Sequence, residues 1–115
     1  MQKIAINKRH GGFSLSREFW ERYAELSGFE LLVKDSKFEG YSLFYKDVEQ
    51  DENLLSEHDL ERDDPILIKV VEELKQKAST MFSDIVIVEI PDDVQWDIEE
   101  YDGLEWVAEK HRRWY

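Results

Sequence analysis

Ile85-Val86-Ile87-Val88-Glu89-Ile90 is a nearly unbroken run of β-branched residues in the last third of this 115-residue chain. β-branched side chains favour extended backbone, and a strand without polar alternation is typical of one covered on both faces. Pro91-Asp92-Asp93 ends the run, because proline and aspartate favour turns. We therefore predict a buried strand over 85–90.

Patterns on the N-terminal side of this strand predict another strand and two helices. Lys3 to Asn7 alternates apolar and polar residues, as a strand does. Ser16 is a suitable N-cap for a helix over about 17–27, which Gly28 ends. Asp63-Asp64-Pro65 begins a second helix, with a carboxylate cap followed by a proline whose missing N–H costs nothing at that position.

The middle of the chain predicts a pair of strands, over 29–33 and 41–46, and then a polar, acidic loop over 48–62. The complete order is β-α-β-β-α-β followed by a C-terminal extension. This order is that of a ferredoxin-like domain. We therefore expect a single α+β domain over residues 1–115 with ferredoxin-like order and a C-terminal β-hairpin. The fold hosts many functions and specifies none of them.

The C-terminal extension contains a strong two-residue hairpin signal, Asp102-Gly103. The turn pairs residues 96–101 with 104–109, so that Tyr101 faces Leu104.

A short helix from Leu104 is the competing interpretation of the same segment. The hairpin register brings Ile98 opposite Val107, which favours it, but it also brings Glu100 opposite Glu105, and like charges oppose pairing.

The composition indicates a folded protein. Apolar residues make up 42% of the chain and aromatic residues 13%, which is enough for one modest core. The absence of cysteine excludes a disulfide framework and a thiolate zinc site, and it fits a reducing compartment. No stretch approaches the roughly 18 apolar residues that span a bilayer, and the N-terminal residues lack the features of a signal peptide. We therefore expect the protein to be located in the cytoplasm.

The net charge of −12 is unevenly distributed. Residues 1–46 contain eight basic and six acidic side chains, whereas residues 47–115 contain seven basic and 21 acidic ones. Residues 84–109 contain ten carboxylates and no Lys or Arg. A field of this sign repels nucleic acids and anionic membranes and attracts basic protein surfaces. We expect a protein partner with a basic surface, without direct nucleic-acid or membrane binding.

A hairpin over 96–109 places acidic and aromatic side chains on shared faces. Aromatic anchors supply affinity and carboxylates steer the encounter, and carboxylates spaced along a strand also imitate a row of phosphates. The alternative is that the charge only keeps a small protein soluble while the aromatic residues fill the core. The candidate protein-binding residues are Asp92, Asp93, Asp97, Glu99, Glu100, Asp102 and Glu105, with Trp96 and Trp106 as anchors.

The loop between the first strand and the first helix is a second candidate site, for a small anionic ligand or a nucleotide. Helix N-termini favour anions, glycines allow close approach, and a basic C-terminus that folds back adds positive charge. The loop matches neither phosphate-binding glycine fingerprint, and an ordinary tight turn with solvated cations explains it as well. Its candidate residues are Lys8, Arg9, His10, Gly11, Gly12, Ser14 and Ser16, together with His111 and Arg112.

Nothing in the sequence assigns a catalytic residue, a metal site or a cofactor. The three histidines lack a neighbouring nucleophile or a ligand pattern. The segment from Asp47 begins like a calcium loop, but Glu52 stands where glycine is needed and His58 where the bidentate glutamate is needed.

Four stretches, Gly11–Ser16, Arg62–Pro65, Ile90–Val94 and Glu99–Arg112, carry a resemblance to a known family. The chain resembles an uncharacterised family of small proteins common in bacteriophage genomes and prophages. This resemblance implies a context, the cytoplasm of a bacterial host, and no catalytic residues. Small acidic phage proteins often inhibit host defence or host enzymes, sometimes by imitating DNA. The hairpin over 34–46 and the acidic loop over 48–61 are longer than the family pattern implies.

The leading hypothesis is a non-enzymatic, phage-derived protein that docks a basic surface of a host protein, such as a nucleic-acid-handling defence enzyme. The alternatives are a small-ligand or nucleotide-binding protein or enzyme, which uses the first loop, and a homodimer formed by exposed strand edges.

Overall fold

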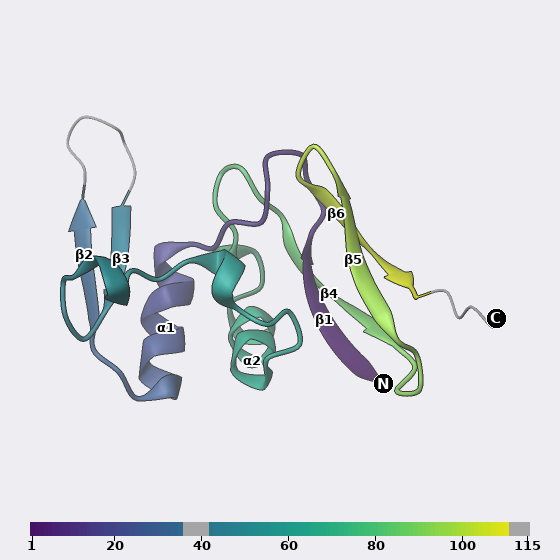
Figure 1. Ribbon diagram of the computed structural model, residues 1–115, viewed down its shortest axis with the longest axis horizontal. Helices are drawn as coiled ribbons and strands as arrows, with labels where there is room; N and C mark the ends of the chain where they lie inside the picture. The colour runs from purple at the N-terminus through teal and green to yellow at the C-terminus, as the bar shows by residue number, and fades with distance from the viewer. Residues whose placement is uncertain (36–41, 111–115) are drawn as a thin grey trace.

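The computed structural model describes residues 1–35 and 42–110, and within them it shows two α-helices and six strands. The strands form three separate two-stranded antiparallel sheets. Figure 1 shows the elements side by side, with one hairpin, two helices, the central strand pair and a second hairpin following one another across the molecule. The two hairpins therefore lie at opposite ends of the fold.

The central strand pair joins β1 (Gln2–Asn7) to β4 (Ile85–Ile90). Ala5 and Ile85 belong to the main hydrophobic cluster with the helices. Ile4 and Ile6 point to the opposite face because side chains alternate along a strand, and both are fully buried there. The strand predicted over 85–90 is thus confirmed, but its burial only in part, because Ile85 alone is fully buried in β4 and Glu89 is exposed.

Helix α1 (Arg17–Ser27) begins and ends where its caps predicted, and α2 (Pro65–Leu74) begins at its predicted cap. The Ser16 hydroxyl accepts a hydrogen bond from the Phe19 amide, and Gly28 ends α1 in the left-handed conformation at φ 81°. The Asp64 carboxylate accepts from the Ile66 amide. A short 3₁₀ segment, η3 (Lys75–Ala78), continues α2. Neither helix in the described ranges is long and apolar enough to cross a membrane.

The hairpin of β2 (Leu31–Asp35) and β3 (Ser42–Lys46) packs on α1, where Phe44 stacks on Trp20 with ring centroids 6.1 Å apart. The acidic loop after β3 contains two short 3₁₀ segments, η1 (Asp51–Asn53) and η2 (Glu57–Asp59).

The order of elements along the chain is the predicted one, but the ferredoxin-like sheet is not confirmed. Among the described strands, β2 and β3 pair only with each other and do not join the central pair. The aromatic face of α1 explains this arrangement. Phe19, Trp20 and Tyr23 form a contiguous aromatic group, so the hairpin buries its apolar side chains on the helix instead of extending the sheet.

The C-terminal hairpin of β5 (Trp96–Tyr101) and β6 (Leu104–Glu109) has the predicted register, with Tyr101 opposite Leu104 and Ile98 opposite Val107. Asp102 at φ 49° and Gly103 at φ 86° form the turn, as expected for a two-residue connection with two positive φ angles. The alternative of a helix from Leu104 is wrong for residues 104–109. Residues 111–115 lie outside the described part.

Candidate functional site

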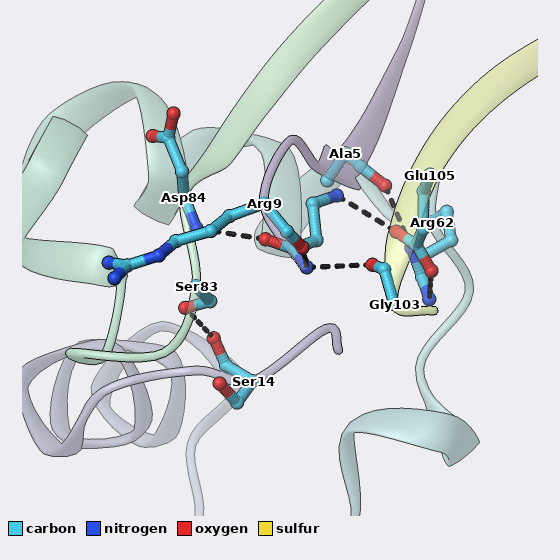
Figure 2. Close-up of polar contacts among 9 residues, drawn as sticks. Ala5, Arg9, Ser14, Arg62, Ser83, Asp84, Gly103 and Glu105 are labelled. Atoms are coloured by element: carbon cyan, nitrogen blue, oxygen red, sulfur yellow. Dashed lines mark hydrogen bonds and ion pairs between the residues drawn. The ribbon is translucent and has the colours of Figure 1, made fainter. Parts of the chain in front are cut away.

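The C-terminal hairpin is attached to the body of the protein by a buried ion pair. The Arg62 guanidinium donates two hydrogen bonds to the Glu105 carboxylate, at 2.7 and 2.9 Å, and the two side chains are 16% and 8% exposed. The backbone amide of Asn7, on β1, donates to the same carboxylate at 2.8 Å. Figure 2 shows the Arg62–Glu105 contact beside the first residues of β6. A bidentate pair with an additional amide donor fixes the strand in orientation as well as position.

Arg62 also contacts the body directly. Its guanidinium lies 3.6 Å from the centroid of the Phe13 ring and donates to the carbonyl of Ala5 at 3.3 Å. The cation therefore has a π face, a carbonyl and a carboxylate as partners, which compensates its desolvation.

The placement of Glu105 corrects the sequence analysis, which assigned it to the exposed acidic surface. Glu105 shares the inner face of the hairpin with Ile98 and Val107, both of them partly buried. Strand alternation alone indicates this face, since Glu105 lies two residues from Val107. The position of Arg62 far away in the sequence gave no comparable signal. Glu100 lies directly opposite Glu105 on the same side of the hairpin. The Arg62 guanidinium compensates the charge of Glu105, so the repulsion expected between the two glutamates does not prevent the pairing.

The tip of the hairpin is docked on the loop after β1. The Gly11 amide donates to the Asp102 carbonyl at 3.2 Å, and the side-chain amide of Asn7 donates to the Gly103 carbonyl at 2.9 Å. A Cβ atom on Gly103 would lie only 2.2 Å from the backbone nitrogen of Gly12. The glycines therefore allow two backbones to approach each other, which is a use of the first loop that the ligand hypothesis did not consider.

The other polar groups proposed for a ligand in this loop also have partners within the protein. The Ser16 hydroxyl caps α1 and donates to the Lys77 carbonyl. The Ser14 hydroxyl lies 2.7 Å from that of Thr80, and the Arg9 guanidinium donates to the Met81 carbonyl at 2.8 Å.

The remaining members of the ligand hypothesis are exposed or lie outside the described residues. Lys8 and His10 are exposed, and the Nδ1 atom of His10 lies 3.2 Å from the Asp102 carbonyl oxygen. His111 and Arg112 lie outside the described part of the chain. The hypothesis of a small anionic ligand stays a prediction.

The outward face of the hairpin, which we call the acidic face, combines carboxylates with aromatic side chains. Asp97, Glu99 and Tyr101 alternate along β5, and Trp106 lies opposite Glu99 on β6. Tyr101 is 72% and Trp106 42% exposed. The indole N–H of Trp106 donates to the Glu99 carboxylate at 3.0 Å, which orients both side chains. Figure 1 shows this hairpin as the outermost layer at its end of the molecule.

Further exposed carboxylates extend the acidic face at both ends. Asp92 and Asp93 lie in the turn before β5, and Asp102 lies in the turn after it. Asp92 pairs with the N-terminal amine at 3.2 Å and Asp97 with Lys110 at 3.6 Å.

Three carboxylates of the acidic face have no ion-pair partner among the described residues, namely Asp93, Glu99 and Asp102. Glu100 also lacks one, but it lies opposite Glu105 and so belongs to the other side of β5, which corrects its assignment to the acidic face. The acidic face is therefore only partly neutralised by its own neighbours.

The two tryptophans predicted as anchors have different positions. Trp96 lies on the inner face with Ile98, is half-buried, and donates its indole N–H to the Gln2 side chain at 3.0 Å. Trp106 lies on the acidic face. Only Trp106 therefore has the placement of an anchor for a partner.

Within residues 1–35 and 42–110, no group of three His, Asp or Glu side chains converges to hold a metal ion.

Comparison of the chain with models of known protein families, with curated proteins and with solved structures found no match. The resemblance to a phage family stays a prediction.

Proposed function

We propose that this protein is a non-enzymatic binding protein whose acidic face docks a basic surface of another protein. The observation that supports this most strongly is the side-by-side placement of Asp97, Glu99, Tyr101 and Trp106 on one outward-facing pair of strands.

The anchoring of the hairpin supports a binding role because it reduces the entropy lost on association. The Arg62–Glu105 pair and the docked turn at Asp102-Gly103 hold the strands at two separate points. A surface that is already ordered loses less conformational freedom when a partner binds.

The charge and the aromatic residues have separate roles in this proposal. Carboxylates raise the rate of encounter with a cationic surface, and this contribution falls with added salt. Trp106 and Tyr101 supply apolar contact area on the face, and such aromatic residues are among those that contribute most to affinity.

A nucleic-acid-handling enzyme is the partner class that the charge pattern favours. Such enzymes bind phosphates through cationic grooves. Asp97 and Glu99 are two residues apart on one strand, which spaces their carboxylates by about 7 Å along a line. A row of this kind presents negative charge to a groove much as a phosphate backbone does.

The test is a charge reversal on the acidic face compared with a matched reversal elsewhere. The test variant carries Asp97→Lys, Glu99→Lys and Asp102→Lys. The control carries Glu52→Lys, Asp59→Lys and Asp63→Lys, three exposed carboxylates of the loop before α2. Both variants change the net charge equally, so a difference between them reports position.

Wild type and control are expected to capture the same partner from an extract of the native cells, and the test variant is not. The association rate of the captured partner with wild type is expected to fall about tenfold between low and high salt. Equal capture by the test variant, or an association rate independent of salt, contradicts the proposal.

A further inference from the structure

The opposite end of the molecule has a strand edge beside a groove. In the described part of the chain, β2 pairs with β3 on one side only. A groove of about 560 Å³ runs between β2 and α1. Its apolar lining comes from Ala24 of α1 and from Phe29, Leu31 and Val33, and its charged lining is Arg17, Glu21 and Glu25.

The hydrogen bonds around β2 show which of its backbone groups point to the free edge. The Glu30 carbonyl accepts from the Asp47 amide at 2.8 Å, and the Glu30 amide donates to the Asp47 side chain. Glu30 thus directs its backbone groups toward β3. Since these directions alternate along an antiparallel strand, Leu31 and Val33 direct their N–H and C=O groups away from β3.

The backbone of β3 confirms this alternation independently. Phe44 lies opposite Val33. Its carbonyl accepts from the Leu55 amide at 2.8 Å, so it points away from β2, as the backbone of a non-hydrogen-bonded pair does.

We propose that the groove between α1 and β2 binds an extended segment of a partner protein, with alternating basic and apolar residues, which adds a third strand along β2. Strand addition uses unpaired main-chain groups of a sheet edge for affinity and adjacent pockets for alternate side chains. Here the outward backbone groups of Leu31 and Val33 are the unpaired main-chain groups, and the apolar lining of the groove forms the pockets for side chains.

The charges around the groove favour a basic occupant. Arg17 lies near two carboxylates, at 3.4 Å from Glu21 and 3.9 Å from Asp35. Arg22 is likewise shared between Glu25 at 2.9 Å and Glu73 at 2.8 Å. Lys46 adds a third cation, with its Nζ atom 5.4 Å from the centroid of the Phe29 ring. Four carboxylates thus face three cations, which leaves an excess of one negative charge around the groove.

The same charges disfavour a second copy of this chain as the occupant. Pairing two β2 edges brings two such negative grooves together on molecules that each carry a net charge of −12. The proposed site is also separate from the acidic face, because the two hairpins lie at opposite ends of the molecule (Figure 1).

The test uses a fluorescein-labelled peptide of alternating lysine and valine, seven residues long, and measures fluorescence anisotropy. The Val33→Pro variant removes one outward N–H without removing a bond to β3, because that N–H does not face β3. The Glu25→Lys variant reverses a charge in the groove. Glu18→Lys is its control, since Glu18 is an exposed residue of α1 that does not line the groove.

Val33→Pro and Glu25→Lys are each expected to weaken binding of the peptide about tenfold, the effect of about one hydrogen bond or charge contact, and Glu18→Lys is expected to leave it unchanged. The triple variant of the acidic face is expected to keep the groove-dependent binding, which separates this proposal from the proposed function. Equal binding by Val33→Pro and wild type overturns it.

Amide hydrogen exchange gives a second readout that does not depend on the variants. The amides of Leu31 and Val33 are expected to exchange quickly in the free protein and slowly with the peptide bound. Fast exchange in the bound state overturns the proposal. Protection without peptide that increases with protein concentration also overturns it, because it assigns the edge to a second copy of the chain.

Discussion

The two terminal hairpins are both two-stranded and antiparallel, yet they are attached to the protein by different interactions. The β5–β6 hairpin is held by the buried Arg62–Glu105 pair and by the docking of Gly103 on the first loop, beside the partly buried Ile98 and Val107 of its inner face. The β2–β3 hairpin is held by aromatic packing, with Phe44 stacked on Trp20.

The kind of attachment determines which part of each hairpin is available to a partner. Polar anchoring through the inner face of β5–β6 leaves its outer face exposed, with Tyr101 and Trp106 in solvent. Apolar packing of β2–β3 on α1 covers one face, and the acidic loop pairs with the edge of β3 through a bridge between Tyr45 and Leu54. What stays accessible there is the edge of β2. One hairpin thus offers a face and the other offers an edge.

The largest expected effect comes from breaking the polar anchor. Arg62→Met leaves the Glu105 carboxylate buried without its cation, and we expect a loss of about 3 kcal/mol in the free energy of unfolding, measured by chemical denaturation. Adding Glu105→Leu to this variant removes the unpaired charge and is expected to recover at least half of the loss. If Arg62→Met alone is as stable as wild type, the Arg62–Glu105 pair does not anchor the hairpin.

A smaller effect is expected at the docked turn. Gly103→Ala introduces a Cβ atom 2.2 Å from the Gly12 nitrogen in addition to strain at φ 86°, and we expect a loss of about 2–3 kcal/mol. Gly12→Ala is the matched control, because Gly12 also has positive φ but a Cβ atom there meets nothing within 4 Å. If Gly12→Ala is at least as destabilising as Gly103→Ala, the close approach of the two backbones is not the reason for glycine at the turn.

The stability of the protein is expected to fall at alkaline pH because of Tyr23, a residue of α1. Burial, followed by the hydrogen bond to Asp64 at 3.0 Å, raises the pKa of Tyr23 to about 12. The folded protein therefore retains a proton that the unfolded chain releases near pH 10. Stability that is complete below pH 10 falls by about 1–2 kcal/mol as the pH rises to 12.

Denaturation of wild type and Tyr23→Phe over this pH range measures the contribution of that tyrosine. The variant lacks the titrating hydroxyl, so its stability is expected to fall less steeply than that of wild type. Parallel curves for the two proteins rule out this contribution.

The smallest effect is expected for an exposed ion pair on the acidic face. Lys110 lies 3.6 Å from Asp97, and both side chains are about half exposed or more. Exposed pairs contribute little, so Lys110→Ala is expected to change the unfolding free energy by less than about 0.5 kcal/mol. If Lys110→Ala lowers the unfolding free energy as much as Arg62→Met does, the exposed pair stabilises the hairpin as strongly as the buried one, which contradicts this account.

Local signals in the sequence predicted the elements whose geometry is set by neighbouring residues. The two-residue turn at Asp102-Gly103 fixes the register of the C-terminal hairpin, and Ser16 and Asp64 fix the starts of the two helices. Each depends on backbone geometry within a few residues.

Features that depend on residues far apart in the sequence were not predicted. The separation of β2–β3 from the central strands depends on the aromatic face of α1, and the burial of Glu105 depends on Arg62, 43 residues away. The pair Gly11-Gly12 is ambiguous for a related reason. Glycine permits close approach of a ligand or of another backbone, and only the position of Gly103 shows the second use.

The most direct test of the central claim is site-specific photo-crosslinking of the protein to its captured partner. A photoreactive phenylalanine replaces Tyr101 on the acidic face in one sample and Val48, an exposed residue after β3, in the other. We expect crosslinks from position 101, to a partner segment rich in Lys and Arg, and none from position 48. Crosslinks from position 48 alone would show that the acidic face is not the docking surface.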